Sequence, residues 1–297
     1  MGRKDETEPN ATDQSILEAW RLLFESETYC RDMVAPQDEP VFGFEVDWDD
    51  LNSYEDLLVN FTENTDHTLE LGNLVLKEQF GLRDLPTRPV IRVINLPESR
   101  NYEVSDLRMR DRNRLLRFDV VVMDVSFPMG WLKKTTYVCN DCDAKWVENE
   151  RMARERRKVK YCRKCLDAIM EDMRSDNKKP FYKDPNDFSM VAEENSYEDV
   201  QYLEFASPNM LVHGDGPLGS NTYQAVVFDE YVGMFSKGDT LTLNALVQID
   251  PMPGRDFVRD TRRMIVLKVH SVEEGLSQSE GFSFSEETGF TFEALDE

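Results

Sequence analysis

Apolar residues in the first third of the chain recur at the spacing of α-helices. A first helix would begin near Asp13 and place four apolar residues on one face: Ile16, Trp20, Leu23 and Phe24. Further helices would follow and end near Gly81, with a second set of apolar residues: Leu57, Leu58, Leu69 and Phe80. The pattern predicts an N-terminal helical bundle over residues 13–87.

From residue 88 the apolar period shortens and β-branched residues become frequent, which is typical of strands. Segments with this pattern are separated by Gly and Pro: 89–94, 118–125, 200–205, 222–228, 240–249 and 264–272. Short strands around a long insertion predict a small β-barrel over residues 88–272. The expected fold class is therefore α+β, with a helical bundle followed by a barrel.

The C-terminal stretch 271–297 contains no Lys or Arg and repeats Gly-Phe-Ser-Phe and Gly-Phe-Thr-Phe. Its composition predicts an acidic disordered tail over residues 273–297. A segment that docks on a partner is the alternative interpretation.

Four of the five cysteines form two CxxC pairs that are nineteen residues apart: Cys139 and Cys142, then Cys162 and Cys165. This spacing matches the tetrahedral all-cysteine site of a structural Zn²⁺, because each pair brings two sulfurs to one metal. Two disulfides are the weaker interpretation, since only Cys30 lies outside the cluster and no secretory segment precedes it. With sulfur at all four positions, no site is open to activate water. We expect this zinc to stabilise a fold.

Acidic residues dominate the charge of the chain. It carries 58 Asp and Glu against 35 Lys and Arg, a net charge of -23, which argues against a surface coated for nucleic acid. Residues 101–170 are the exception, with sixteen basic and eleven acidic residues. We interpret the acidity as adaptation to a halophilic cytoplasm, and mimicry of DNA is the alternative. No apolar run approaches the roughly 18 to 20 residues that cross a bilayer, so we expect a cytoplasmic protein without membrane contact.

Motifs of nucleotide and catalytic sites are weak in this sequence. Residues 214–219 fit GxGxxG, but a strand-like run follows where a phosphate loop needs a helix N-terminus, so a β-turn is the better interpretation. No GxxxxGK[ST] occurs, so no P-loop is present to hold a nucleotide. His67, His213 and His270 lie on different predicted elements, without a paired nucleophile and base. We expect no enzymatic activity from this chain alone.

The order of these parts resembles the N-terminal region of archaeal minichromosome maintenance (MCM) replicative helicases. A helical bundle, an Arg-rich segment, a Lys-Lys pair, two CxxC knuckles and barrel strands follow one another over roughly residues 13–272. Short motifs support the resemblance: residues 46–51 (VDWDDL), 95–97 (NLP), 104–108 (VSDLR), 199–201 (DVQ), 228–233 (FDEYVG) and 237–241 (KGDTL).

The resemblance implies an oligonucleotide-binding (OB) fold barrel with a zinc ribbon inserted at about residues 132–190 and the helical subdomain appended. In that family the unit forms one tier of a hexameric ring around DNA, and an AAA+ ATPase module, which this sequence lacks, follows it. The implied partners are single-stranded DNA and MCM-type subunits, or further copies of this chain in a hexamer.

DNA binding requires cations along the phosphate path. Lys133 and Lys134 resemble a family position that contacts single-stranded DNA. A second group lies earlier in the same basic segment: Arg108, Arg110, Arg112, Arg114 and Arg117. An arginine at every second or third position is equally typical of a solvated face in an acidic protein. The basic run 151–160 would bind DNA or an acidic neighbour, such as another subunit or the tail.

The sequence also departs from the family pattern. Residues 203–207 (LEFAS) have an acid where the family commonly has a base, and the predicted hairpin 208–221 contains no Lys or Arg. Fewer phosphate contacts mean weaker binding, which salt weakens further. Three functions remain open: a non-catalytic MCM N-terminal-like protein that binds single-stranded DNA or joins an MCM ring, the non-ATPase part of a split or truncated helicase, and a zinc-ribbon protein-protein adaptor that has lost DNA binding.

Overall fold

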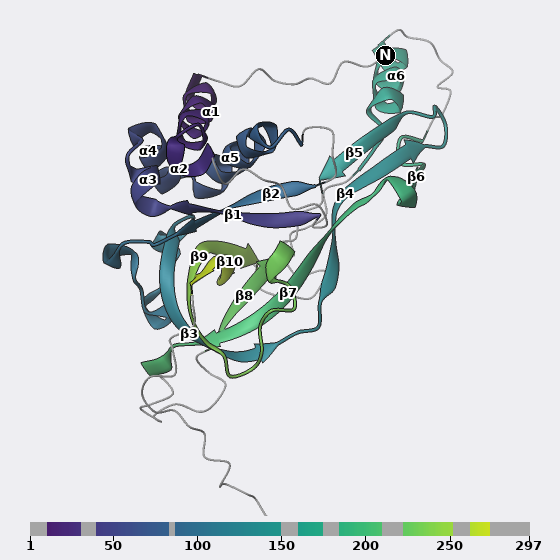
Figure 1. The fold of residues 1–297 in the computed structure, drawn as a ribbon. Coiled ribbons are helices and arrows are strands. Elements are labelled where there is room, and N and C mark those ends of the chain that lie inside the picture. Colours follow the sequence, from purple (N-terminus) through teal and green to yellow (C-terminus); the bar gives the residue numbers. More distant parts are fainter. Residues whose placement is uncertain are drawn as a thin grey trace, which may run out of the picture.

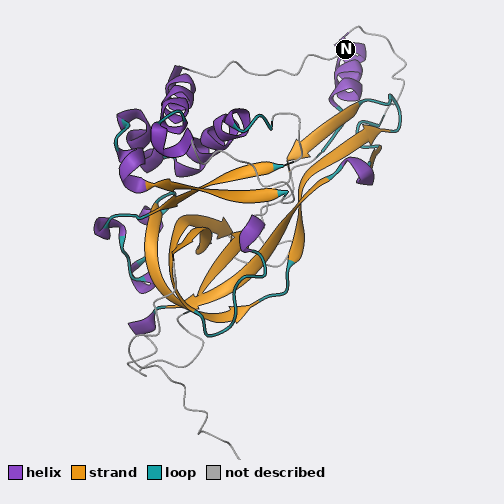
Figure 2. Ribbon diagram, in the orientation of Figure 1, coloured by secondary structure: helices purple, strands orange, loops and turns teal. Residues whose placement is uncertain are grey.

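The structure, a computed structural model, describes residues 11–30, 40–82, 87–149, 160–174, 184–209, 222–251 and 262–273. Helices gather at one end, strands curl into a barrel next to them, and an arm carrying α6 (Arg163–Arg174) projects from the barrel (Figure 1). Figure 2 shows the same division, with strands in the centre of the molecule and most of the helices at its periphery.

The helical subdomain is built on two longer helices and three short ones: α1 (Ala11–Phe24), α2 (Glu27–Cys30), α3 (Trp48–Asn52), α4 (Glu55–Glu63) and α5 (Thr65–Gln79). The predicted apolar face of α1 is buried, because four of its residues are each 1% exposed or less: Ile16, Trp20, Leu23 and Phe24. Burial of this stripe is what stabilises so short a helix, since isolated helices of this length are marginal in water.

A two-stranded parallel sheet lies against the helices. β1 (Val41–Asp47) pairs with β2 (Arg88–Ile94) over its whole length. The strand at β2 was predicted, but β1 was missed, although every second residue of β1 is buried. The expected boundary between residues 87 and 88 stays a prediction, and β1 and β2 pair across it.

Gly72 allows α5 to approach two neighbours at once. A Cβ atom at this position would lie 2.5 Å from Cδ1 of Ile91 in β2 and 2.7 Å from Cε2 of Trp20 in α1. Both distances are shorter than a van der Waals contact between carbon atoms. The glycine therefore belongs to the packing of the subdomain and not to a turn.

Five strands close into the barrel: β3 (Leu115–Val125), β7 (Ser196–Ala206), β8 (Tyr223–Phe228), β9 (Thr240–Pro251) and β10 (Arg263–Glu273). They pair in the ring β3-β9-β10-β8-β7-β3, which is antiparallel except between β8 and β10. A closed five-stranded barrel of this kind is the architecture of an OB fold. The predicted barrel is confirmed.

Single-turn 3₁₀ helices occupy the connections around the barrel: η1 (Glu98–Arg100), η2 (Val104–Asp106), η3 (Met109–Asp111), η4 (Ala192–Glu194) and η5 (Asp229–Tyr231). The barrel interior is filled by alternate strand residues such as Phe118, Phe205 and Leu243, all fully buried. A β-bulge between Val122 and Asp124 bends β3 so that its two ends pair with different strands.

The arm is inserted between β3 and β7. β4 (Met129–Cys139) pairs with β7 along its first half and with β5 (Lys145–Asn149) and β6 (Phe188–Met190) along its second half. Its strands are held together by aromatic rings whose centroids lie 5.2 to 5.7 Å apart: Tyr137, Trp146 and Phe188. The predicted insertion into the barrel is confirmed.

Some predicted features lie outside the described residues. These are most of the basic run (150–159), the GxGxxG motif and His213 with most of the hairpin (210–221), and the tail after Glu273 (274–297). None of the helices in the described ranges is long and apolar enough to cross a membrane.

Candidate metal centre and nucleic-acid interface

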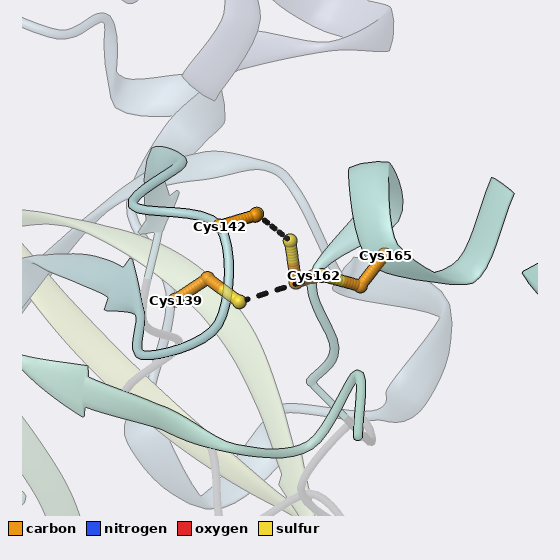
Figure 3. A group of neighbouring side chains, drawn as sticks. All are labelled: Cys139, Cys142, Cys162 and Cys165. Atoms are coloured by element: carbon orange, nitrogen blue, oxygen red, sulfur yellow. Dashed lines mark hydrogen bonds between the residues drawn. The ribbon is translucent and has the colours of Figure 1, made fainter. Parts of the chain in front are cut away.

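The four cysteines of the predicted zinc site meet in the arm. Cys139 ends β4 and Cys142 lies in the turn after it, whereas Cys162 precedes α6 and Cys165 lies in its first turn. Figure 3 shows their side chains converging from the two knuckles. All four Sγ atoms lie within 4.8 Å of one another.

The distances between sulfurs fit a tetrahedral metal site. Sγ of Cys139 lies 3.6 Å from Sγ of Cys165, and Sγ of Cys142 lies 3.5 Å from Sγ of Cys162. Four Zn–S bonds of about 2.3 Å in a tetrahedron place the sulfurs roughly 3.8 Å apart, whereas a disulfide requires about 2.05 Å. The cluster can therefore hold one metal ion of zinc's size and softness, and its thiols are not cross-linked.

Electrostatics in the cluster also favour a bound cation. Burial raises the pKa of Cys142, but the Ala144 N–H and the neighbouring thiols more than offset it and lower this pKa to about 7. Burial is the main cause that raises the pKa of Cys162 and of Cys165. Four thiolates this close repel one another, so complete ionisation of the cluster requires a cation at its centre.

Both knuckles are tied to the segment 184–190. The N–H of Cys162 donates to the carbonyl of Pro185 at 2.7 Å, and the N–H of Asn140 donates to the carbonyl of Asp187 at 3.1 Å. The Asn140 side chain donates to the Asp187 carboxylate at 2.7 Å. Because one strap holds both halves of the site, the sulfurs are positioned by the backbone as well as by any metal.

The five cations predicted to bind DNA fall into two classes. Lys134 and Arg112 are exposed, and neither makes an ion pair within the described part of the chain. The other three pair with carboxylates of the same chain: Lys133 with Glu198, Arg114 with Asp111 at 3.0 Å, and Arg117 with Glu273 at 3.0 Å. Glu198 and Glu273 are remote in sequence, so only the fold reveals these two pairings.

The structure places these cations in two separate patches. In the strand pairing, the backbone of Lys134 lies opposite Ser196 of β7 and Asn149 of β5, at the base of the arm. Arg117, by contrast, lies on the β3 segment that pairs with β9, and Leu115 at the start of β3 packs in the core of the helical subdomain. The lysines and the arginines therefore do not form one continuous site.

Lys133 and Lys134 form what we call the lysine patch. A network of ion pairs that the sequence did not predict joins this patch to the helical subdomain. Glu198 contacts Arg88 of β2 at 3.0 Å as well as Lys133, and Arg88 also pairs with Asp229. Its neighbour Arg92 binds Glu230 through two hydrogen bonds of 2.7 and 2.8 Å. The signal in the sequence was a charged residue at the centre of the apolar run of β2.

Arg92 and His270 are buried at the junction between β2 and the barrel. Arg92 Nη1 donates to the carbonyl of His270 at 2.9 Å, and the Val93 N–H donates to Nε2 of His270 at 2.8 Å. Burial first, and then the charges of Arg92 and Lys268, lower the pKa of His270 well below its usual value. His270 is therefore a neutral acceptor that fixes β2 on the barrel.

Comparisons with known proteins place this fold. No family model matches the chain, and no curated protein matches it in sequence. Among solved structures it is similar to the crystal structure of the N-terminal domain of an archaeal MCM, with a TM-score of 0.65 and 14% identity. The similarity covers 88% of this chain and 98% of that one.

The helical subdomain, OB barrel and cysteine-bearing insertion define the chain as an α+β module of the OB-fold class. More narrowly, its fold is that of the archaeal MCM N-terminal domain, which confirms the resemblance seen in the sequence. At 14% sequence identity, this similarity shows a shared fold and nothing further.

Proposed function

We propose that this chain is a non-catalytic MCM N-terminal-like protein that binds single-stranded DNA and associates with MCM-type subunits or with copies of itself in DNA replication. The observation that carries the proposal is the fold shared over nearly the whole length of both chains. A split helicase whose ATPase lies on another chain would use the same module.

The cysteine cluster supports a structural zinc in this proposal. Cys139, Cys142, Cys162 and Cys165 would hold the ion, and its four thiolates would leave no position for a substrate or water. A zinc ion held there would cross-link the two knuckles and would supply no reaction chemistry. The arm then serves to position the residues at its base.

The lysine patch has the groups that single-strand binding requires. Lys134 offers an exposed cation. Tyr197, which is 59% exposed, lies on β7 opposite Leu132, the residue that directly precedes the two lysines. A cation for the phosphate and an aromatic face for the base are the two elements of sequence-tolerant binding. Lys133 would join them if its pairing with Glu198 were exchanged for a phosphate.

A second candidate is an adaptor that binds proteins and no longer binds DNA. The observation that favours it is the pairing of Lys133, Arg114 and Arg117 with carboxylates of the chain itself. Such cations contribute less to phosphate binding because a competing anion already occupies them.

Anisotropy of a fluorescent single-stranded oligonucleotide, titrated with salt while light scattering records particle mass, tests the proposal. We expect saturable binding that weakens with salt. A ring-sized particle would support assembly into a hexamer. A monomer that ignores DNA at low salt would overturn the proposal in favour of the adaptor.

Variants of the lysine patch make the test specific. Lys134→Glu should weaken binding to all sequences and lower the salt slope by about one. Glu198→Gln should strengthen binding, because it releases Lys133. Arg21→Glu, the same change of charge on the exposed face of α1, is the control and should leave both quantities nearly unchanged. Equal effects of the Lys134 and Arg21 variants would remove the lysines from the site.

A further inference from the structure

One carboxylate lies between the lysine patch and the first residue of β2. Oε1 of Glu198 is 3.0 Å from Nη1 of Arg88 and also pairs with Nζ of Lys133. The side chain of Glu198 is only 13% exposed, whereas those of Arg88 and Lys133 are 33% and 35% exposed. A single, largely buried oxygen therefore holds two cations that belong to different parts of the molecule.

A β-bulge at the base of the arm lets Lys133 reach this oxygen. The register of β4 on β7 skips Lys133, which is thus the extra residue of the bulge. Bulges redirect side chains relative to the regular strand. Glu198 lies on β7 opposite Trp131, two residues before Lys133, while the next residue, Lys134, is exposed. The bulge accounts for the different surroundings of the two lysines.

Arg88 has a second partner, which competes with Glu198 for its guanidinium group. Nη2 of Arg88 donates to Oδ1 of Asp229, whose side chain is 9% exposed. Four groups of alternating charge therefore contact one another in the order Lys133, Glu198, Arg88, Asp229. Two like charges that share one partner also repel each other, so the loss of either one leaves the other more firmly held.

We propose that Arg88 is a positioning residue of the lysine patch, which sets how readily Lys133 exchanges Glu198 for a phosphate of single-stranded DNA. This inference rests on the proposed function. With Arg88 in place, Glu198 is shared and Lys133 can leave it. Without Arg88, Glu198 has Lys133 as its one cation among the described residues and holds it more firmly. Asp229 acts in the opposite direction, because it draws Arg88 away from Glu198.

The coupling between the two contacts is reciprocal. A phosphate that takes Lys133 leaves Glu198 to Arg88 alone, which strengthens the attachment of β2 to β7. Arg88 lies where β1 and β2 begin, since it pairs with Val41 and its N–H donates to the carbonyl of Pro40 at 2.8 Å. Binding of DNA at the base of the arm should therefore also stabilise the start of this two-stranded sheet.

Acylation of lysines by an N-hydroxysuccinimide ester, mapped by mass spectrometry on the full chain at low salt, tests the ion pairs without DNA. The reagent needs a free amine, so a lysine held by a carboxylate reacts more slowly. We expect Lys133 to react about two- to fivefold more slowly in Arg88→Gln than in the native chain, and faster by a similar factor in Asp229→Asn. Lys134 is the internal control and should react equally in all three proteins.

Two results would overturn the proposal. One is an unchanged rate of Lys133 in both variants. The other is a parallel change of Lys133 and Lys134, which would mean a general effect of charge. Asp229→Asn decides the test if the Arg88 variant fails to fold, because asparagine tolerates the positive φ of residue 229, 61°, and the expected change has the opposite sign.

A double-mutant cycle with Glu198→Gln measures the consequence for DNA. Arg88→Gln should weaken binding of a single-stranded oligonucleotide about two- to fivefold when Glu198 is present, and should change it little in the Glu198→Gln chain. An equal loss in both backgrounds would mean that Arg88 acts only through its charge at a distance, and the proposal would then be wrong.

The two readouts separate this inference from the proposed function. If the acylation rate of Lys133 responds as expected but the native chain does not bind DNA, the coupling of the ion pairs stands and the proposed function fails. If the native chain binds DNA and the rate of Lys133 does not respond, the proposed function stands and this inference fails.

Discussion

Cys139 and Cys30 differ in what surrounds their thiols. Cys139 is fully buried with its sulfur among three others, whereas Cys30 is exposed at the end of a short helix. The first is in a position to act as a metal ligand, and the second is a surface residue. A substitution of Cys30 can therefore serve as the control for a substitution of Cys139.

Cys139→Ser should abolish stoichiometric zinc binding and unfold the ribbon, because binding free energy at such sites is folding free energy. Metal analysis, together with hydrogen exchange of the amides in β4 and β5, measures the effect. Cys30→Ser should retain the metal and the protection. Full zinc content and unchanged thermal stability in Cys139→Ser would disprove the site.

His270 makes the stability of the protein depend on pH. Its pKa in the folded state lies below the unfolded value of about 6.5, so the unfolded chain binds the proton more readily. The contribution of neutral His270 is fully present above about pH 6.5 and is lost as the pH falls towards the folded pKa, at no more than about 1.4 kcal/mol per pH unit.

Urea unfolding between pH 7.5 and 5.5 measures this dependence. His270→Gln should show a smaller loss of free energy over that range than the native chain, whatever its absolute stability. His67→Gln is the control, since His67 is partly exposed and pairs with Asp13 on the surface. Parallel curves for the native chain and His270→Gln would contradict the assignment.

At the scale of elements, helix α5 shows packing overriding helix propensity. Alanine forms helices better than glycine by about 1 kcal/mol, so propensity alone favours Gly72→Ala. The added Cβ, however, would meet the Trp20 ring and Ile91. We expect Gly72→Ala to destabilise the protein by about 1 to 3 kcal/mol, the usual cost of overpacking.

Urea denaturation measures the change at Gly72. Leu74→Ala, on the exposed side of the same helix, is the control and should change stability by less than about 0.5 kcal/mol. A Gly72→Ala variant that is as stable as the native chain would show that α5 can move away from Trp20.

Strands show how far local pattern predicts structure. Strands β3, β7, β8, β9 and β10 were predicted within a few residues of their observed ends, because β-branched runs bounded by turns are a local signal. β1 was missed within the region assigned to helices. β2 pairs with β1 and not with a barrel strand. This pairing joins residues more than forty positions apart, and the apolar period of a segment does not indicate which distant strand it pairs with.

At the scale of the whole molecule, the acidic surface should make stability depend on salt. A net charge of -23 repels itself, and the Debye length falls from about 10 Å at 0.1 M to about 3 Å at 1 M salt. We expect the melting temperature to rise as KCl increases from 0.1 to 1 M.

Sucrose of equal osmolarity is the control for solute effects other than screening, and it should raise the melting temperature less than KCl does. A melting temperature that falls with KCl would mean that ion pairs such as those of Arg88 and Arg92 outweigh the general repulsion. It would also contradict adaptation to a salt-rich cytoplasm.

Features that depend on local chemistry could be predicted from the sequence. The spacing of Cys139, Cys142, Cys162 and Cys165 was enough to predict a four-sulfur cluster, and the apolar periods were enough to predict a helical bundle and a barrel with an insertion. Which cations are exposed, in contrast, depends on how the chain folds. Lys133 and Lys134 are neighbours in sequence, yet one pairs with Glu198 and the other is exposed. An ion pair between remote residues forms only when the fold brings its charges within a few ångströms, because water and salt screen them at longer range.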